Sequence, residues 1–206
     1  MGIIDKITID DQRHEVIVRC DGQSYRITTF DYNRLAIEQG EEVSEDTINE
    51  LILSESRLAC IQKAFVHLSY GDLSKKRLSE KLRRAFPSEI CTEVVDLLEE
   101  RGYINDLRLA ERYADNYYSI RSYGPLRIKQ ELHSKGFSRD IIETVLEPYI
   151  SMDHREKVQE LLEQKFKNIR CGDYTIKKKA AAWLNRQGYS WSDISDVLST
   201  FFQEND

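Results

Sequence analysis

Glycine and proline are scarce in this sequence, with nine and three residues among 206. Flexible low-complexity linkers are therefore not expected. No run approaches the roughly 20 apolar residues that a membrane-spanning helix requires. The first residues also lack the apolar segment typical of a secretion signal. We therefore expect a cytoplasmic protein that does not enter the membrane.

Residue sets that bind metals or carry out catalysis are missing as well. The four cysteines and four histidines lie far apart, with no CxxC pair and no spacing typical of zinc ligands. The sequence contains no glycine-rich phosphate loop, no HExxH motif and no GxSxG motif. We predict free thiols, as is usual in a reducing cytosol. We also predict no enzymatic activity and no metal, nucleotide or other cofactor.

Charged residues are abundant, but acidic residues outnumber basic ones, and the formal net charge is −6. The protein as a whole should not attract polyanions, so any contact with nucleic acid requires a local basic surface. Many of the charges form pairs at helical spacing, such as Arg127 with Glu131. Each such pair stabilises a helix by only about 0.2–0.5 kcal/mol. Most of these side chains are therefore expected to be solvated.

The first fifty residues differ in pattern from the rest. Residues 3–9, 15–20 and 23–27 are short, β-branched and partly alternating, and Asp21-Gly22 between the last two is a strong hairpin signal. We predict a small β-meander, then a helix near residues 31–38 and another from about Ser44. A sheet of this size is too small to stand alone and should pack on the helices that come after it in the chain.

From about Glu55 the apolar residues adopt the helical period, and a repeat emerges. Phe86, Phe137 and Tyr189 recur at intervals of about fifty residues, which is within the range of helical repeat arrays. Apolar residues recur around each aromatic residue: Leu82, Leu132 and Leu184 before it, and Val94-Val95, Val145-Leu146 and Val197-Leu198 after it. Gly136 and Gly188 precede the last two aromatic residues, where the end of a helix favours a left-handed residue.

These patterns predict an all-α protein. We expect a tandem array of three three-helix repeats in a curved, extended arrangement, with the small β-meander at the N-terminus. The predicted boundaries are 1–53 for the meander with its short helices, 54–105 for repeat 1, 106–150 for repeat 2 and 151–206 for repeat 3. Stripes with helical spacing support this division: Leu58, Ile61, Phe65 and Leu68; Ala110, Tyr113, Tyr117 and Ile120; and Val158, Leu161, Phe166 and Ile169.

The most specific stretch is residues 101–137. It carries an ordered set: Gly102, Tyr103, Ile104, Asp106, Ala110, Arg121, Gly124, Pro125, Arg127, Ile128, Leu132, Lys135 and Gly136. This set resembles the signature of the RecX family, with Asn105 as a mild departure because family members often carry aspartate there. The resemblance implies a non-enzymatic regulator, mostly an inhibitor, of the RecA recombinase in DNA repair, recombination and the SOS response. It further implies binding in the groove of RecA–single-stranded DNA filaments.

Local physics explains many of these residues without reference to a partner. Gly102 should end one helix, and Pro125 after Gly124 suits the first position of another. Asp106, Ser88 and Ser138 are predicted helix caps, and Asp153 is expected just before the first helix of repeat 3. Tyr103, Ile128 and Leu132 are predicted core residues.

The arginines are not required by packing and are better candidates for binding. Aligning the repeats on their leucines brings Arg77, Arg127 and Lys179 to one equivalent position, which we call the basic ladder. In a repeat array such positions line up along one surface. Further candidates for contacts with a partner or with DNA are Arg84, Arg121, Lys129, Lys178 and Arg186. The alternative is that lysine and arginine, as good helix formers, fall on exposed positions by chance.

Trp183 lies on the same stripe as Lys179 and Arg186 and could stack on a partner or pack within the protein. Two further functions are compatible with the basic ladder: a module that binds nucleic acid directly, and a general protein-interaction scaffold. The first predicts affinity for bare DNA that falls steeply with salt. For the RecX-like function we expect a monomer with at most weak direct contact with DNA.

Overall fold

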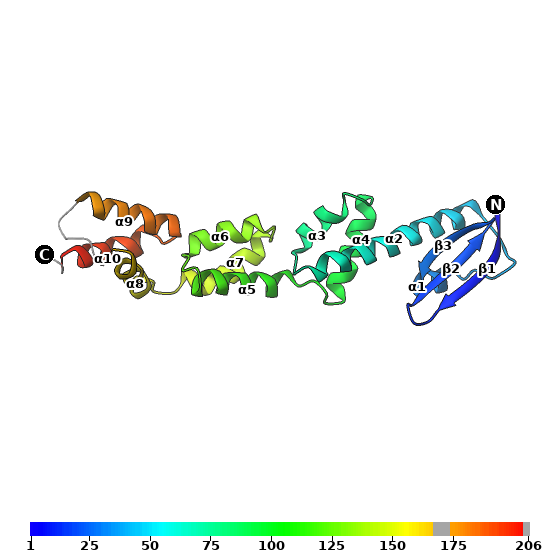
Figure 1. Cartoon of the computed structure of the whole chain (residues 1–206), viewed down its shortest axis with the longest axis horizontal. Coiled ribbons are helices and arrows are strands. Elements are labelled where there is room, and N and C mark those ends of the chain that lie inside the picture. Colours follow the sequence, from blue (N-terminus) through cyan, green and yellow to red (C-terminus); the bar gives the residue numbers. More distant parts are fainter. Residues whose placement is uncertain (167–173, 204–206) are drawn as a thin grey trace. The chain divides into compact units, whose positions relative to one another are not determined.

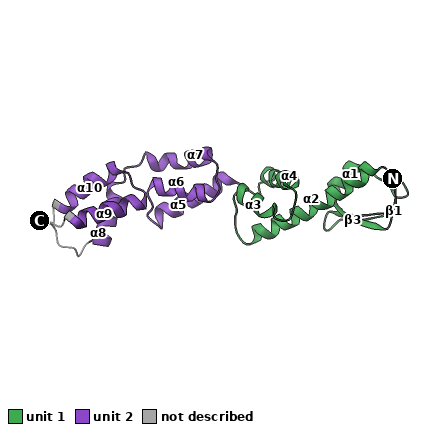
Figure 2. Cartoon of the chain, turned by 90° about the horizontal axis from the view of Figure 1, so that it is seen from above, with its two compact units in different colours: residues 1–104 green, residues 105–206 purple. Residues whose placement is uncertain are grey.

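The computed structural model describes residues 1–166 and 174–203, which form a four-stranded sheet and ten helices (Figure 1). The chain divides into two compact units, residues 1–104 and 105–206 (Figure 2). Within the described residues no helix is both long enough and apolar enough to cross a membrane. The sheet and the ten helices confirm the predicted mostly helical fold with an N-terminal sheet.

The sheet contains the predicted meander of β1 (Gly2–Asp10), β2 (Glu15–Cys20) and β3 (Gln23–Thr28). Asp21 and Gly22 both have positive φ, 48° and 79°, as the predicted hairpin turn requires. A fourth strand, β4 (Glu42–Val43), pairs with β1 and gives the antiparallel order β3-β2-β1-β4. The sequence did not predict β4, because two residues are too few to show an alternating pattern.

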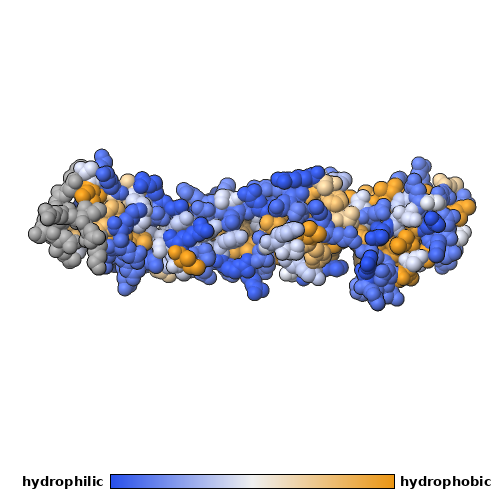
Figure 3. Space-filling view, viewed as in Figure 1, coloured by the Kyte–Doolittle hydropathy of each residue, from blue (hydrophilic) through white to orange (hydrophobic). Residues whose placement is uncertain are grey.

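One face of the sheet is covered and the other is largely open. Val16, Val18 and Ile27 are fully buried and pack together with Leu51 of helix α2 (Glu45–Ser69). The short helix α1 (Thr29–Leu35) contacts β2 and β3. Apolar side chains are also exposed on this part of the surface (Figure 3), among them Ile3 of β1, which is 53% exposed.

Helix α2 connects the sheet to the first repeat. It begins where predicted, and Ser44 caps its start, because the Ser44 hydroxyl accepts a hydrogen bond from Thr47 N. Leu51 belongs to the core under the sheet, whereas Cys60 and Ala64 belong to the core of the first repeat. The predicted boundary between residues 53 and 54 thus falls inside one continuous helix. Among the described residues, Cys20, Cys60 and Cys91 are buried free thiols, and Cys171 lies outside them.

The three-helix repeats succeed one another along the chain. After α2, their helices are α3 (Lys75–Leu82), α4 (Ser88–Glu100), α5 (Asp106–Ser119), α6 (Pro125–Ser134), α7 (Arg139–Ile150), α8 (Arg155–Phe166), α9 (Tyr174–Gln187) and α10 (Trp191–Gln203). Leu82, Leu132 and Leu184 are all fully buried, as the repeat predicts. Each leucine lies in a separate apolar cluster, so every repeat has its own small core.

Most predicted helix ends are confirmed, and two caps are corrected. Gly102, Gly136 and Gly188 all have positive φ just after a helix, Pro125 begins α6, and the Ser138 hydroxyl accepts from Ile141 N. Asp106 is not the cap of α5, because the side chain of Asn105 accepts the hydrogen bond from Arg108 N. Ser88 is not a cap either, since Pro87 precedes α4 and Ser88 is already its first residue. Both errors displace a helix start by one residue.

Three residues predicted to be buried are exposed, and the first is Phe65 of α2, at 39%. Tyr103 is 57% exposed, because it lies in the turn between α4 and α5 and only meets Phe65 edge-on, with 4.9 Å between ring centroids. Ile120 is 76% exposed, because it comes after the end of α5, where the helical stripe no longer applies. Ile128 and Leu132 are fully buried, as predicted. Ile169 lies outside the described residues.

Candidate partner-binding surface

Charge is segregated between the helices of each repeat. The second helices, α3, α6 and α9, together contain ten Lys and Arg residues and two Asp and Glu residues. The third helices, α4, α7 and α10, contain one basic and ten acidic residues. The net charge of −6 thus conceals second helices that are strongly basic in α3 and α9 and weakly basic in α6, and third helices that are acidic. A basic helix of this kind is the local surface that a contact with an acidic partner requires.

Most of the predicted binding residues lie exposed on or beside the basic helices. In unit 2, Lys129 is exposed on α6, and Lys178, Lys179 and Arg186 are exposed on α9, which has no acidic residue. In unit 1, Arg84 is exposed just beyond the end of α3. These positions leave the lysine and arginine side chains available to a partner.

The three members of the basic ladder differ in their surroundings. The side chain of Arg77 is 51% exposed, and its Nη1 lies 3.3 Å from Glu80 Oε2. Lys179 is exposed, whereas the side chain of Arg127 is only 30% exposed. Because Arg77 lies in unit 1 and the other two in unit 2, the alignment of all three along one surface stays a prediction.

Arg127 makes several contacts within unit 2. Its Nη1 donates to the side-chain oxygen of Gln187 at 3.1 Å and to the backbone oxygen of Arg186 at 3.4 Å. Its Nη2 donates to the Tyr123 hydroxyl at 3.0 Å, and its guanidinium carbon lies 3.8 Å from the centroid of that ring. The predicted pair with Glu131 is present but long, at 3.9 Å. Much of the hydrogen-bonding capacity of Arg127 is therefore used inside the protein.

A row of tyrosines with cations over their rings was not predicted. Tyr117 lies nearly parallel to Tyr113 and to Tyr123, with ring centroids 6.0 and 5.7 Å apart. Arg121, an exposed candidate, lies 5.6 Å from the centroid of Tyr117, and Lys135 lies 4.5 Å from that of Tyr113. A hydrogen bond to Tyr123 raises the pKa of Arg121 above its ordinary value. The spacing of Tyr113 and Tyr117, four residues apart on one helix, was the available signal.

The sequence of the two C-terminal repeats matches two known domains. Residues 105–146 match the second three-helix domain of RecX, and residues 153–198 match the third. The regulatory protein RecX of Pseudomonas fluorescens is 32% identical over 133 residues, which cover 64% of this chain and 84% of that protein. The chain belongs to the RecX family. The assignment made from residues 101–137 is thereby confirmed.

RecX proteins also resemble this chain over nearly its whole length. The regulatory protein RecX of Clostridioides difficile is 26% identical over 202 residues, which cover 97% of this chain and 95% of that protein. A crystal structure of regulatory protein RecX has the same fold, with a TM-score of 0.78 at 19% identity over 97% of this chain and all of that one. The structure of RecX from Lactobacillus salivarius gives a TM-score of 0.61 at 25% identity, over 71% of this chain and 96% of that one.

Three other features of the chain bear on possible sites. No cluster of three or more metal-ligating side chains occurs there. A cavity of about 450 Å³ lies between the sheet and α2, lined by apolar and polar side chains that include Arg26 and Glu55. Trp183 packs within its own repeat. The centroid of its ring lies 6.0 Å from that of Phe166 and 4.1 Å from Lys165 Nζ. Packing is thus the better account of this tryptophan.

Proposed function

We propose that this chain is a non-enzymatic regulator of the RecA recombinase that binds RecA–single-stranded DNA filaments. The observation that carries the proposal is the similarity to regulatory RecX proteins over 97% of the chain. The segregation of charge supports a choice of surface. Basic helices on a protein of net charge −6 can meet acidic filament surface or DNA phosphate while the overall charge opposes non-specific binding to polyanions.

The proposed mode of action derives from the repeats. Each repeat offers one basic helix, so a monomer can make several weak contacts along the groove of a filament. Because these contacts are linked in one chain, their combined affinity exceeds that of any single contact. Bridging neighbouring RecA subunits in this way would alter filament growth, ATP hydrolysis and strand exchange in cytoplasmic DNA repair and the SOS response. We propose inhibition as the outcome, as RecX membership implies.

Direct binding to nucleic acid is the second candidate, and one observation favours it. Helix α9 carries four basic residues and no acidic residue. Such a helix is suited to contact a phosphate backbone, with an affinity that falls steeply with salt, because the release of counterions from DNA becomes less favourable as the salt concentration rises. This activity and filament binding use the same surface and must be separated by experiment.

The two candidates are distinguished by co-sedimentation. The protein is mixed either with RecA filaments assembled on single-stranded DNA or with the same DNA alone, at two salt concentrations. Regulation of RecA requires strong sedimentation with filaments and little with bare DNA. Equal binding in both mixtures, with a steep loss at high salt, would support direct nucleic-acid binding. An absence of binding in the filament mixture would contradict the proposed function.

A further inference from the structure

Helix α6 begins where helix α9 ends, although the two belong to different repeats (Figure 1). Gly124 N donates to Gln187 O at 2.8 Å, and Leu126 N donates to Gly188 O at 3.1 Å. The first N–H groups of a helix and the last carbonyl groups of another have no partners within their own helices. Here each end satisfies the other, and the positive end of one helix dipole meets the negative end of the next.

This contact requires glycine on both sides. A Cβ atom on Gly124 would lie 2.4 Å from the carbonyl carbon and oxygen of Gly188. A Cβ atom on Gly188 would lie 2.3 Å from Arg127 N, and Gly188 also has a φ of +94°. Both distances are far shorter than side chains tolerate. The two glycines therefore allow the backbones of repeats 2 and 3 to touch.

Arg127 closes the contact from the side. Its guanidinium group reaches from α6 across the junction to Arg186 O and to the side chain of Gln187, at the end of α9. Stacking on Tyr123 holds the guanidinium plane in place. The two terminal nitrogens of the planar guanidinium fork have different partners: Nη1 donates to the end of α9 and Nη2 to Tyr123, an arrangement that the single nitrogen of an ammonium group cannot reproduce. Arg127 is thus placed as a clamp between the two repeats.

A second set of contacts between repeats 2 and 3 lies beside this junction. The Tyr189 hydroxyl donates to Ser122 O at 3.2 Å, and the Tyr189 ring meets the ring of His154 with centroids 5.7 Å apart. His154 is 2% exposed, and its Nε2 lies 2.7 Å from Tyr149 O, at the end of repeat 2. The apolar cores of the two repeats are separate clusters, and these contacts add to the connection between them.

We propose that this junction holds α6 and α9 end to end as one continuous basic surface, and that Arg127 is a positioning residue of that surface rather than a partner contact. The role of the surface rests on the proposed function, whereas the rigidity of the junction does not. Lys129, Lys178 and Lys179 remain exposed to meet the partner, while the guanidinium group of Arg127 is engaged internally. Loss of the clamp should therefore affect binding through alignment.

The rigidity of the junction is tested by measuring the distance between two spin labels. The labels are attached to cysteines that replace the exposed residues Gln130 of α6 and Ala182 of α9. Cys171 is replaced by serine, since Cys20, Cys60 and Cys91 are buried. The parent protein should give one narrow distance distribution. Arg127→Ala and Arg127→Lys should both broaden it, whereas Lys129→Ala, on the same helix, should not. A distribution that stays equally narrow in Arg127→Ala would overturn the inference.

A matched pair of glycine variants provides a second test. Gly188→Ala places a Cβ against Arg127. The control is Gly102→Ala, because φ of Gly102 is also positive, at +76°, but a Cβ there would meet nothing within 4 Å. Both variants should lose stability through backbone strain. Only Gly188→Ala should broaden the distance distribution between Gln130 and Ala182. Equal distributions in the two variants, with helicity retained in circular dichroism, would contradict a close contact at Gly188.

The same variants are then tested for co-sedimentation with RecA filaments. Arg127→Lys keeps the charge but loses the fork, and it should reduce filament affinity on the order of tenfold if alignment of the two helices matters. Reduced binding by Arg127 variants whose label distances are unchanged would make Arg127 a partner contact and refute the positioning role. If the parent protein fails to bind filaments, the proposed function fails, and the label distances still decide the rigidity of the junction.

Discussion

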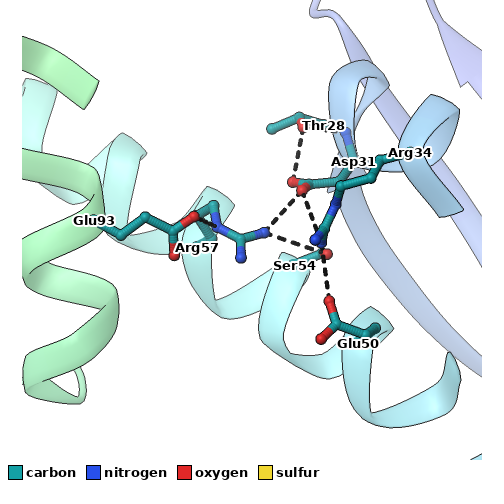
Figure 4. A network of polar contacts seen from close by, with 7 residues as sticks. All are labelled: Thr28, Asp31, Arg34, Glu50, Ser54, Arg57 and Glu93. Carbon is teal, nitrogen blue, oxygen red and sulfur yellow. Dashed lines mark hydrogen bonds and ion pairs between the residues drawn. The ribbon is translucent and has the colours of Figure 1, made fainter. Parts of the chain in front are cut away.

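Asp31 is a buried carboxylate that joins three elements of unit 1 (Figure 4). It is 2% exposed and accepts hydrogen bonds from the Thr28 hydroxyl at 2.9 Å and from Arg57 Nη1 at 2.8 Å. Arg57 in turn lies 2.7 Å from Glu93 of α4 through its Nε. Buried charges are tolerated only when they are paired. The network therefore connects α1, α2 and the first repeat at a point where each charge depends on the others.

Removal of one partner from this network should be costly. Arg57→Ala leaves Asp31 buried without its closest cation and is expected to lower the free energy of unfolding by roughly 3 kcal/mol. Arg34→Ala is the matched control, because Arg34 also lies near Asp31, at 3.6 Å, but its side chain is 46% exposed. That change should cost less than about 1 kcal/mol. Urea denaturation of both variants measures the difference, and equal losses would contradict the role given to Arg57.

The buried thiols predict a response to alkaline pH. Burial, followed by the proximity of Cys91, raises the pKa of Cys60 from 9.0 to about 12. A thiol whose pKa is raised by folding contributes stability below its ordinary pKa of 9.0 and loses it as the pH approaches the folded value. The free energy of unfolding should therefore fall above about pH 9. Replacing Cys60 by alanine should flatten this decline, and an unchanged pH profile in that variant would argue against burial of the thiol.

At the scale of helices, the predicted helix ends can be tested by single substitutions. The side chain of Asn105 accepts a hydrogen bond from Arg108 N, at 2.9 Å, at the start of α5. Asn105→Ala should lower the free energy of unfolding by about 1 kcal/mol. Ser88→Ala is the control at the start of α4, where Ser88 is the first residue of the helix and no side chain caps it, and it should change stability by less than about 0.5 kcal/mol. Thermal denaturation compares the two, and a larger loss in Ser88→Ala would reverse our assignment.

The helix boundaries show what a single sequence can and cannot specify. Left-handed residues at helix ends were predicted correctly at Gly136 and Gly188, because only glycine adopts that conformation at little cost. Caps were less certain, since Asn105 and Asp106 are adjacent and both are good capping residues. Strand β4 could not be predicted, because its two residues pair with β1 only through the tertiary fold.

At the scale of the molecule, the repeat and the family were predictable, but the connection between repeats was not. The repeat arises from apolar residues that must be buried in each unit, such as Leu132 and Leu184. The junction at Gly124 and Gly188 joins residues far apart in sequence through backbone atoms, and backbone contacts leave no pattern of side chains to read. For the same reason Arg127 was grouped with exposed basic residues, although its position depends on residues of the next repeat.

The basic surface is best tested with residues that are exposed and lie outside this junction. Reversing Lys129, Lys178 and Lys179 to glutamate should reduce filament binding by at least about tenfold, because three attractive contacts become repulsive. Stability should change little, since exposed substitutions usually alter it by less than about 0.5 kcal/mol each. The matched control reverses three basic residues on other helices: Lys63 of α2, Arg108 of α5 and Arg139 of α7.

Both triple variants change the net charge by the same amount, so a general effect of charge would weaken them equally. Specific use of the basic second helices requires that only the first variant lose affinity in co-sedimentation with RecA filaments. Loss of binding to bare single-stranded DNA alone, with filament binding retained, would assign these lysines to nucleic acid. If both variants bind filaments as well as the parent protein, α6 and α9 are not the binding surface, and the acidic third helices become the next surface to test.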